Sequence, residues 1–370
     1  MYTLLVPLLA MIGGHLASSV AAQLGPGAGP WEIATPESQG LSSELLIAAE
    51  RRVDEVMNDR LCYIVVKNGY IVHETYHRGH TESSLHTGWS TTKSLCASLY
   101  GVAVQQGWAD VDDRVADRNS GTRECNADAT FRHVLSMTGQ STNIEEPQFS
   151  YDASGLACLD ALADFIHENN PEGLTGREWK DKYYQEALGF EHTVWEDGPG
   201  VPALGHFPCG WGIQTSCRDL ARAGQLWIND GLVPTRLRPE GVPLVPRQYM
   251  TEARRWVYPD SGTEYGYTAW LNEEDPVDPE VANFIGAGEQ CVTVSHEHQA
   301  VIVSMGSSSP GGCQSWSLAR DYIVSKKHPQ HWQNVTVPPV LNSKGASSAA
   351  GFSPMPLTEA SLGTANHSDV

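Results

Sequence analysis

The first half of the chain alternates between helical and strand-like spacing of its apolar residues. Residues 41–59 carry apolar side chains at helical spacing behind Ser42 or Ser43, which predicts a helix with a serine N-cap. Residues 62–77 contain two β-branched runs around Asn68-Gly69. This pattern predicts a hairpin, because both central positions of such a turn need positive φ.

The second half returns from helical to strand-like spacing. Helical periodicity begins at Ser90 and continues, with interruptions, through residues 131–231. Strand character resumes at 265–271 and at 290–306, where His296-Glu297-His298 predicts a turn. Residues 315–327 have the spacing of a last helix.

The order of these elements favours a mixed α/β (α+β) fold. The flanking segments, residues 23–100 and 251–327, can form one antiparallel sheet with N- and C-terminal helices on it. Residues 101–250 then form an all-helical lobe. A site is expected between the two lobes.

The two ends of the chain differ in composition from this domain. Residues 1–22 contain an apolar run followed by small residues, which predicts a signal peptide cleaved before Gln23. No Lys or Arg precedes the run, and Gly13-Gly14 interrupts it too early for a membrane span. Residues 328–370 are rich in Pro, Ser, Ala and Thr and predict a disordered tail, with glycosylation sequons at Asn334 and Asn366.

Charge and cysteine content indicate an extracellular protein that does not bind nucleic acid. The 24 Lys and Arg against 44 Asp and Glu give a net charge of -20, which repels phosphate backbones. Eight cysteines without a C-x-x-C pair fit an oxidising compartment better than a zinc site. The pairs that bracket short segments, Cys209 with Cys217 and Cys291 with Cys313, are the first disulfides to expect.

The chemistry-bearing motif is Ser90-Thr91-Thr92-Lys93, the one S-x-x-K in the chain. At a helix N-terminus, residues i and i+3 share a face, so the lysine amine can reach the serine hydroxyl. A lysine buried beside the positive end of a helix holds its proton less tightly and can act as a base. The alternative for the tetrapeptide alone is a serine N-cap followed by a surface lysine.

Three further segments favour the catalytic interpretation. They are GVAVQQGWADVDDRV (101–115), FRHVLSMTGQ (131–140) and GWGIQTSCRDLARAGQLWINDG (210–231). Together with the S-x-x-K motif, they resemble, in order, the serine β-lactamase and penicillin-binding-protein family. The closest similarity is to its class C-related esterases, carboxypeptidases and aminohexanoate-dimer hydrolases. This resemblance implies an α/β lobe, a helical lobe, Ser90 as nucleophile and Lys93 as its base.

The family's second motif, Tyr-x-Asn, is altered in this chain. Tyr151 in FSYDASG is the best positional match, and the resemblance gives it the role of passing a proton to the leaving group. Ala153 stands where the motif has Asn. Tyr151 as a packing residue at a helix start, and Ser141-Thr142-Asn143 as a competing Ser-x-Asn, both stay open.

The third motif, Lys-Thr-Gly or His-x-Gly, is also altered. The corresponding stretch is Phe284 to Gln290, where Ala287, Gly288 and Glu289 can offer an oxyanion N–H and substrate contacts. It contains no Lys or His to bind a substrate carboxylate. This argues for an esterase or amidase over a β-lactamase, and the alternative for the glycines is a simple bend in an edge strand.

His73-Glu74-Thr75-Tyr76-His77 matches the zinc-protease pattern H-E-x-x-H, which requires a helix. In the predicted strand, the two histidines would lie about 13 Å apart, too far for one zinc. No metal or cofactor is therefore expected.

The sequence predicts a secreted serine hydrolase that acts on a small-molecule ester or amide through a Ser90 acyl-enzyme. A catalytically weak or inactive binding or scaffold protein of the same fold is the first alternative. A β-lactamase or D-Ala carboxypeptidase is the second. The oligomeric state is left open.

Overall fold

The computed structural model describes residues 23–57, 59–121, 123–196, 205–272, 281–307, 313 and 320. The predicted signal peptide, the tail with its two sequons, and the last helix apart from Arg320 lie outside the described residues. No helix of the described part is long and apolar enough to cross a membrane.

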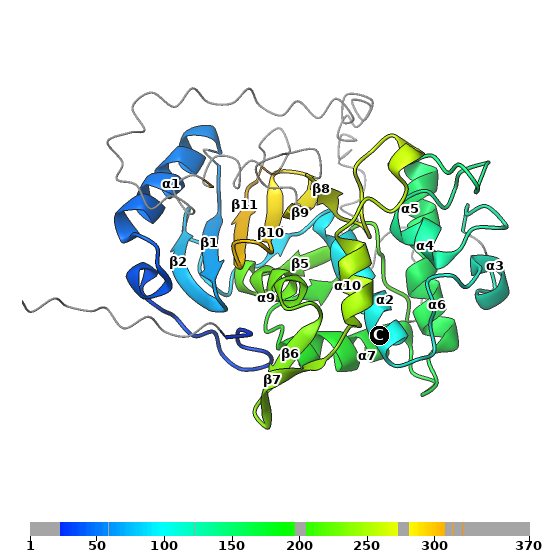
Figure 1. Ribbon diagram of the computed structural model, residues 1–370, viewed down its shortest axis with the longest axis horizontal. Helices are drawn as coiled ribbons and strands as arrows, with labels where there is room; N and C mark the ends of the chain where they lie inside the picture. The colour runs from blue at the N-terminus through cyan, green and yellow to red at the C-terminus, as the bar shows by residue number, and fades with distance from the viewer. Residues whose placement is uncertain are drawn as a thin grey trace, which may run out of the picture.

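Six antiparallel strands form the main sheet, in the order β2-β1-β11-β10-β9-β8 (Figure 1). The antiparallel sheet predicted from both ends of the chain is confirmed, since strands from residues 62–76 pair with strands from residues 281–305. The six strands are β1 Cys62–Lys67, β2 Tyr70–Tyr76, β8 Trp270–Leu271, β9 Val281–Gly286, β10 Gln290–Ser295 and β11 Ala300–Met305.

Small strands and short helices complete the fold. One three-stranded sheet contains β3 His86–Thr87, β4 Val194–Trp195 and β5 Ile213–Thr215, and a two-stranded sheet contains β6 Leu232–Thr235 and β7 Arg238–Pro243. The helices are α1 Ser43–Val56, α2 Thr91–Gln105, α3 Val115–Arg118, α4 Phe131–Leu135, α5 Ala153–Leu159, α6 Ala161–Asn169, α7 Gly176–Lys180, α8 Glu186–Leu188, α9 Cys217–Ile228 and α10 Arg247–Ala253. Single turns of other helix types are η1 Pro36–Gln39, η2 Asp181–Gln185 and η3 Pro259–Ser261.

Local sequence signals account for the first elements. Ser42 is the N-cap of α1, and its hydroxyl accepts a hydrogen bond from the Leu45 N–H at 3.3 Å. In the β1–β2 hairpin, Asn68 has φ 52° and Gly69 has φ 83°, as the predicted Asn-Gly turn requires. The turn predicted at His296 to His298 also joins β10 to β11.

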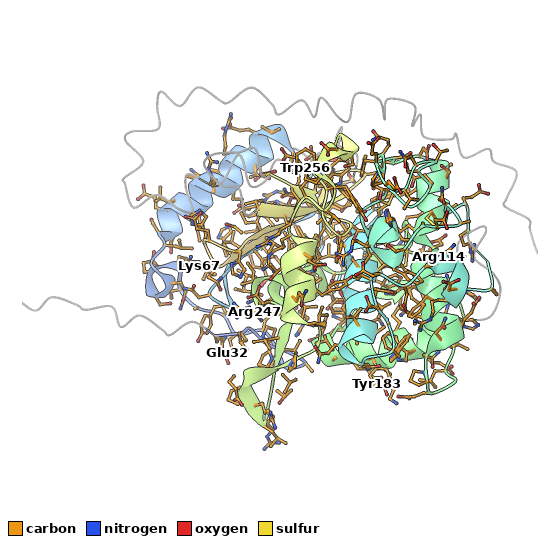
Figure 2. The ribbon with its side chains drawn as sticks, turned by 45° about the vertical axis from the view of Figure 1, so that its right-hand side comes forward. Glu32, Lys67, Arg114, Tyr183, Arg247 and Trp256 are labelled. Carbon is orange, nitrogen blue, oxygen red and sulfur yellow. A yellow bond between two sulfur atoms is a disulfide. The ribbon has the colours of Figure 1, made fainter. Side chains whose placement is uncertain are left out.

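The helix α2 lies between the sheet and the helical lobe (Figure 1). Its side chains from Thr91 to Ala103 are all buried, which explains why its sequence lacks a polar face. Helices α3 to α6 gather on the side of α2 away from the sheet, whereas α1 covers the opposite end near β2. Figure 2 shows the same separation, with Lys67 on the sheet side and Arg114 on the helical side.

The helix α9 packs directly on β10 and β11. It approaches them closely at Gly224, where an added Cβ would lie 2.5 Å from Val301 Cγ1 and 3.0 Å from Val292 Cγ1. The sequence-based boundary at residue 250 places α9 in the helical lobe. In the structure, α9 packs on the sheet.

Four disulfides join the elements. Cys291–Cys313 is paired as predicted. The predicted Cys209–Cys217 pair is wrong, because Cys209 bonds Cys96 and Cys217 bonds Cys62. The strand β5 lies between Cys209 and Cys217, and an extended segment keeps two Cα atoms too far apart for a disulfide. The remaining pair is Cys125–Cys158.

Substitution of Gly224 with Val tests the close contact between α9 and the sheet. We expect a loss of about 2 kcal/mol in the free energy of unfolding, because overpacking against Val301 and Val292 outweighs the gain in helix propensity. Chemical denaturation measures it. Gly121→Val is the control, since an added Cβ there meets nothing within 4 Å, and an equal loss in both variants would contradict this account of the packing.

Candidate active site

The turn before α2 places Ser90 at the junction of the two lobes. Gly88 is required there, because a Cβ at this position would lie 2.4 Å from Ile213 Cγ1 on β5. Trp89 follows with φ 47°, a conformation that non-glycine residues rarely adopt. Gly286, at the end of β9, lies against the same turn, since its added Cβ would be 2.5 Å from the Gly88 carbonyl oxygen. Two glycines thus allow β5 and β9 to approach the segment that carries Ser90.

Ser90 and Lys93 form a hydrogen-bonded pair. Lys93 Nζ donates to Ser90 Oγ at 2.7 Å and to the Gly210 carbonyl oxygen at 2.6 Å. The Lys93 side chain is 1% exposed, so it is not the surface lysine of the alternative interpretation. Ser90 is at the N-cap position but makes no side-chain capping bond, which leaves its hydroxyl to Lys93. The backbone of Lys93 is also held, because its carbonyl accepts from Thr268 Oγ1 at 2.9 Å.

Tyr151 contacts this pair through its aromatic ring. Lys93 Nζ lies 4.7 Å from the centre of the Tyr151 ring, within the range of a cation–π contact. Among the described residues, no hydrogen bond joins the Tyr151 hydroxyl to Ser90 or Lys93. The competing Ser141 is engaged in its own loop, where its hydroxyl donates to the Asn143 carbonyl and accepts from the Gln148 N–H.

An aromatic cluster continues from Tyr151 away from Lys93. The Trp270 ring lies 5.6 Å from that of Tyr151 and 5.1 Å from that of Tyr265. Phe149 contacts both Tyr265 and Trp270, at 5.0 and 5.8 Å. We call Phe149, Tyr151, Tyr265 and Trp270 the aromatic wall. Within it, the Tyr151 ring contacts Lys93, and the other three rings pack behind it, with Tyr265 buried.

Residues 287–289 form the turn between β9 and β10, directly after Gly286. Ala287 is exposed, Gly288 is partly exposed and Glu289 is buried. At the helix, the Ser90 N–H has no partner among the described residues, as expected for the first residues of a helix. The amide of Gln290 holds the turn in place by donating to the carbonyls of Gly288 at 3.1 Å and Gly306 at 2.7 Å.

The side chain of Glu289 is buried next to the carboxylate of Asp59. Burial and this second negative charge raise the pKa of Glu289 to about 7. Asp59 accepts hydrogen bonds from the N–H and hydroxyl of Ser307, both at 3.1 Å. Glu289 therefore contributes its backbone to the turn that follows Gly286, while its carboxyl group lies beside Asp59, just before the start of β1.

Comparison with solved structures identifies the fold of the chain. A 6-aminohexanoate-dimer hydrolase homologue from Bacillus anthracis is similar at a TM-score of 0.59 and 15% identity, covering 82% of this chain and 89% of that one. A β-lactamase from Mycobacterium bovis matches at a TM-score of 0.56 and 15% identity, over 75% of this chain and all of that one (100%). EstCE1, a hydrolase with promiscuous acyltransferase activity, matches at 0.56 and 10%, over 78% and 99%. No family model and no curated protein matches the chain.

The chain has the serine β-lactamase and penicillin-binding-protein fold. This is the fold that the S-x-x-K motif and the three segments after it predict. In this β-lactamase fold, α2 is the central helix, and Ser90 lies at its first turn, between the sheet and the helical lobe.

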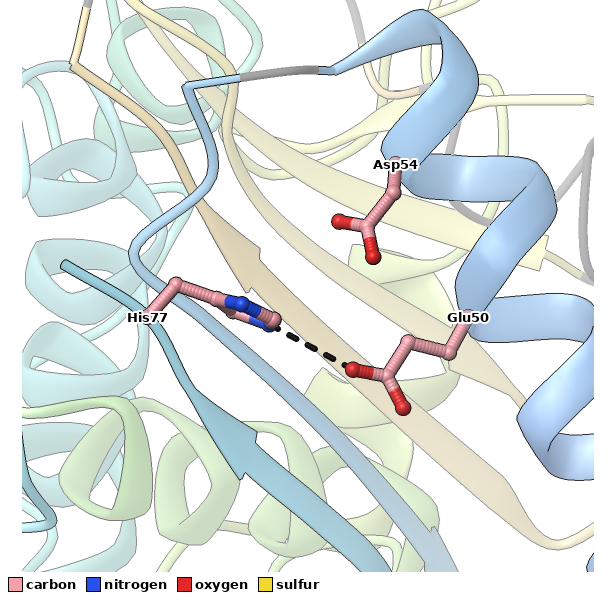
Figure 3. A group of neighbouring side chains, drawn as sticks. All are labelled: Glu50, Asp54 and His77. Carbon is pink, nitrogen blue, oxygen red and sulfur yellow. Dashed lines mark ion pairs between the residues drawn. The ribbon is translucent and has the colours of Figure 1, made fainter.

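The H-E-x-x-H segment has a structural role in this fold. It lies in and directly after strand β2, as predicted, and Glu74 pairs with Arg218 at 2.7 Å. His73 and His77 instead face Glu50 of α1, at 2.7 and 3.3 Å (Figure 3 shows His77).

Glu50, Asp54 and His77 have ligand atoms close enough together to hold a metal ion (Figure 3). Arg60 already occupies this cluster, since its Nη2 lies 3.2 Å from Glu50, 2.5 Å from Asp54 and 3.0 Å from His77. Burial opposes ionisation of Glu50, but hydrogen bonds from His73 and Thr75 and the nearby positive charge lower its pKa to about 2. The arginine cation thus neutralises the carboxylates, and we do not assign a metal here.

Two features of the site were not predicted from the sequence. The Gly210 carbonyl, the second acceptor of Lys93, lies in the segment GWGIQTS, but a side-chain pattern does not reveal a backbone acceptor. The aromatic wall draws Tyr265 and Trp270 from the segment 265–271, which the sequence predicts only as a strand.

The substitution Glu289→Gln tests whether the Glu289 carboxyl group is buried beside Asp59. The folded-state pKa of about 7 lies above the ordinary 4.5, so the folded protein binds this proton more tightly than the unfolded chain. The contribution of Glu289 to stability is therefore complete below about pH 4.5 and is lost as the pH rises through 7. We expect Glu289→Gln to raise Tm by a few degrees at pH 8 and to change it little at pH 4.5. A larger gain at pH 4.5 than at pH 8 would contradict this assignment.

Proposed function

We propose that this protein is a serine hydrolase that cleaves neutral, apolar esters or amides through an acyl-enzyme on Ser90. The observation that carries the proposal is the 2.7 Å contact between Lys93 Nζ and Ser90 Oγ at the start of a buried helix. In the proposed reaction, Lys93 acts as the neutral amine: its Nζ takes the hydroxyl proton and becomes an ammonium group while Ser90 Oγ attacks the substrate carbonyl carbon.

The oxyanion that forms needs hydrogen-bond donors already in place. We assign this role to the Ser90 N–H and to a backbone N–H of the turn at residues 287–289, which follows the β9 glycine that touches the Ser90 turn. The tetrahedral intermediate then collapses, and the leaving group accepts a proton delivered from Lys93. Water hydrolyses the acyl-enzyme by the same steps in reverse order.

Tyr151 assists this proton transfer in the proposal. Its ring already contacts Lys93 Nζ, and catalytic hydrogen bonds often tighten only when substrate is bound. A rotation of the Tyr151 side chain would bring its hydroxyl to the leaving group.

Two observations support a neutral, apolar substrate. Ala287, Gly288 and Glu289 occupy the stretch where β-lactamases and carboxypeptidases contact a substrate carboxylate, and they supply no cation. The aromatic wall offers ring surface next to the nucleophile, suited to an apolar acyl group. A β-lactamase or D-Ala carboxypeptidase activity is therefore the weaker candidate.

A catalytically inactive binding protein is the second candidate. It is favoured by one observation, the lack of a hydrogen bond from the Tyr151 hydroxyl to Ser90 or Lys93 among the described residues. We further propose that the protein is secreted, since four disulfides are stable in an oxidising compartment.

Substitution of the nucleophile and base tests the proposed activity. With p-nitrophenyl butyrate as substrate, we expect Ser90→Ala to abolish turnover and Lys93→Met to lower kcat/KM by about 10²–10⁴-fold, because the base is lost while the buried volume is kept. Circular dichroism confirms that the variants fold. Turnover of Ser90→Ala at the wild-type rate would remove the proposal, and an inactive wild-type protein would favour the binding-protein candidate.

Shortening the aromatic wall tests the substrate class. We expect Trp270→Ala to raise KM about tenfold for p-nitrophenyl phenylacetate and to leave p-nitrophenyl acetate nearly unchanged, a difference of about 1.4 kcal/mol. The control is Trp108→Ala, which removes a tryptophan that packs on Phe165 and Trp179 instead. If both esters respond equally to Trp270→Ala, the wall does not bind the acyl group.

A further inference from the structure

The second acceptor of Lys93 is a backbone carbonyl, and its position depends on the loop that carries it. Gly210 is buried and follows Cys209, between the helical lobe and β5. Its carbonyl oxygen lies 2.6 Å from Lys93 Nζ. Since Lys93 Nζ also contacts Ser90 Oγ and faces the Tyr151 ring, this carbonyl fixes the direction in which the amine points.

Two anchors hold this loop. The first is the Cys96–Cys209 disulfide, which ties it to α2 about one turn beyond Lys93. The second is Asp160, at the start of α6, whose Oδ1 accepts a hydrogen bond from the Cys209 N–H at 2.9 Å. The Gly210 N–H also faces this carboxylate. Asp160 thus binds the backbone immediately before the carbonyl that Lys93 uses.

Among the described residues, no ion pair explains the presence of Asp160. Arg123, whose positive charge acts on Asp160, is hydrogen-bonded through two of its nitrogens to Asp164, and His206 also contacts Asp164 at 2.9 Å. Asp160 does not cap α6 through its side chain either. Its side chain contacts the backbone N–H groups of the 209–210 segment.

We propose that Asp160 is a positioning residue for catalysis, which orients the Gly210 carbonyl and through it the amine of Lys93. This inference rests on the proposed function, since it concerns the same base. It predicts that loss of the Asp160 contact lets the Cys209–Gly210 peptide rotate while the disulfide keeps the loop attached. Lys93 then loses its orientation toward Ser90, and the chemical step slows without unfolding of the protein.

The test compares the rate at which Ser90 reacts with a fluorophosphonate probe in the full-length protein. Asp160→Ala removes the acceptor, and Asp160→Glu keeps the charge but displaces the acceptor by about one methylene. We expect both variants to react about 10–100-fold more slowly than wild type, in line with the cost of a misplacement of about 1 Å. Asp160→Asn keeps an oxygen in the same place and is expected to react within about threefold of wild type.

Asp164→Ala is the matched control, because it removes a carboxylate one turn further along α6 that contacts the side chains of Arg123 and His206, not the backbone of Cys209 and Gly210. We expect it to lower Tm but to leave the rate of Ser90 labelling unchanged. With p-nitrophenyl butyrate, Asp160→Glu should lower kcat and leave KM unchanged, a split that a general loss of stability does not produce.

Wild-type labelling rates in Asp160→Ala and Asp160→Glu would overturn the inference while leaving the proposed function intact. Should Asp160→Ala fail to fold, the comparison of Asp160→Glu with Asp160→Asn decides the matter, because equal rates in these two variants contradict the inference. Equal labelling of wild type and Ser90→Ala would instead show that the proposed function itself has failed.

Discussion

The hydrogen bond between Lys93 Nζ and Ser90 Oγ depends on a helix that begins inside the protein. Taking a lysine amine out of water is costly unless polar partners replace the solvent. Here the partners are the Ser90 hydroxyl, the Gly210 carbonyl and the Tyr151 ring, which come from three separate segments of the chain. Lys93 is buried, whereas Ser90 stays partly exposed, so the serine can be reached from solvent while the lysine amine is held inside the protein. The fold therefore serves to bring these segments to the first turn of α2.

Several contacts hold these segments together at the first turn of α2. Gly88 and Gly286 let β5 and β9 touch the turn before Ser90, and a side chain at either position would separate them. The Thr268 hydroxyl holds the backbone of Lys93, while the Cys96–Cys209 disulfide ties α2 to the loop that carries Gly210. The sheet and the helical lobe are thus linked at the candidate site itself, as the proposed reaction requires, since the reactivity of a nucleophile depends on placement within about 1 Å.

Local signals made much of the fold predictable. The serine cap of α1, the Asn68-Gly69 turn and the S-x-x-K pair all concern residues within four positions of each other, and their physics is independent of the rest of the chain. Tyr151 was identified by its similarity to a motif, and its ring does lie beside Lys93. The partners of Cys209 and Cys217 were not predictable, because sequence separation says nothing about which distant strands and helices meet. The Gly210 carbonyl and the Asp160 contact were missed for a related reason, since both involve backbone atoms that any residue carries.

The proposed chemistry requires that Ser90 carries the acyl group. Rapid acid quenching of the protein with p-nitrophenyl butyrate, followed by intact-mass and peptide mass spectrometry, measures this directly. We predict a mass increase equal to one butyryl group, located on the peptide that contains Ser90 and absent from Ser90→Ala. An acyl group found on another residue, or ester turnover by wild type with no trapped intermediate and no loss in Ser90→Ala, would contradict it.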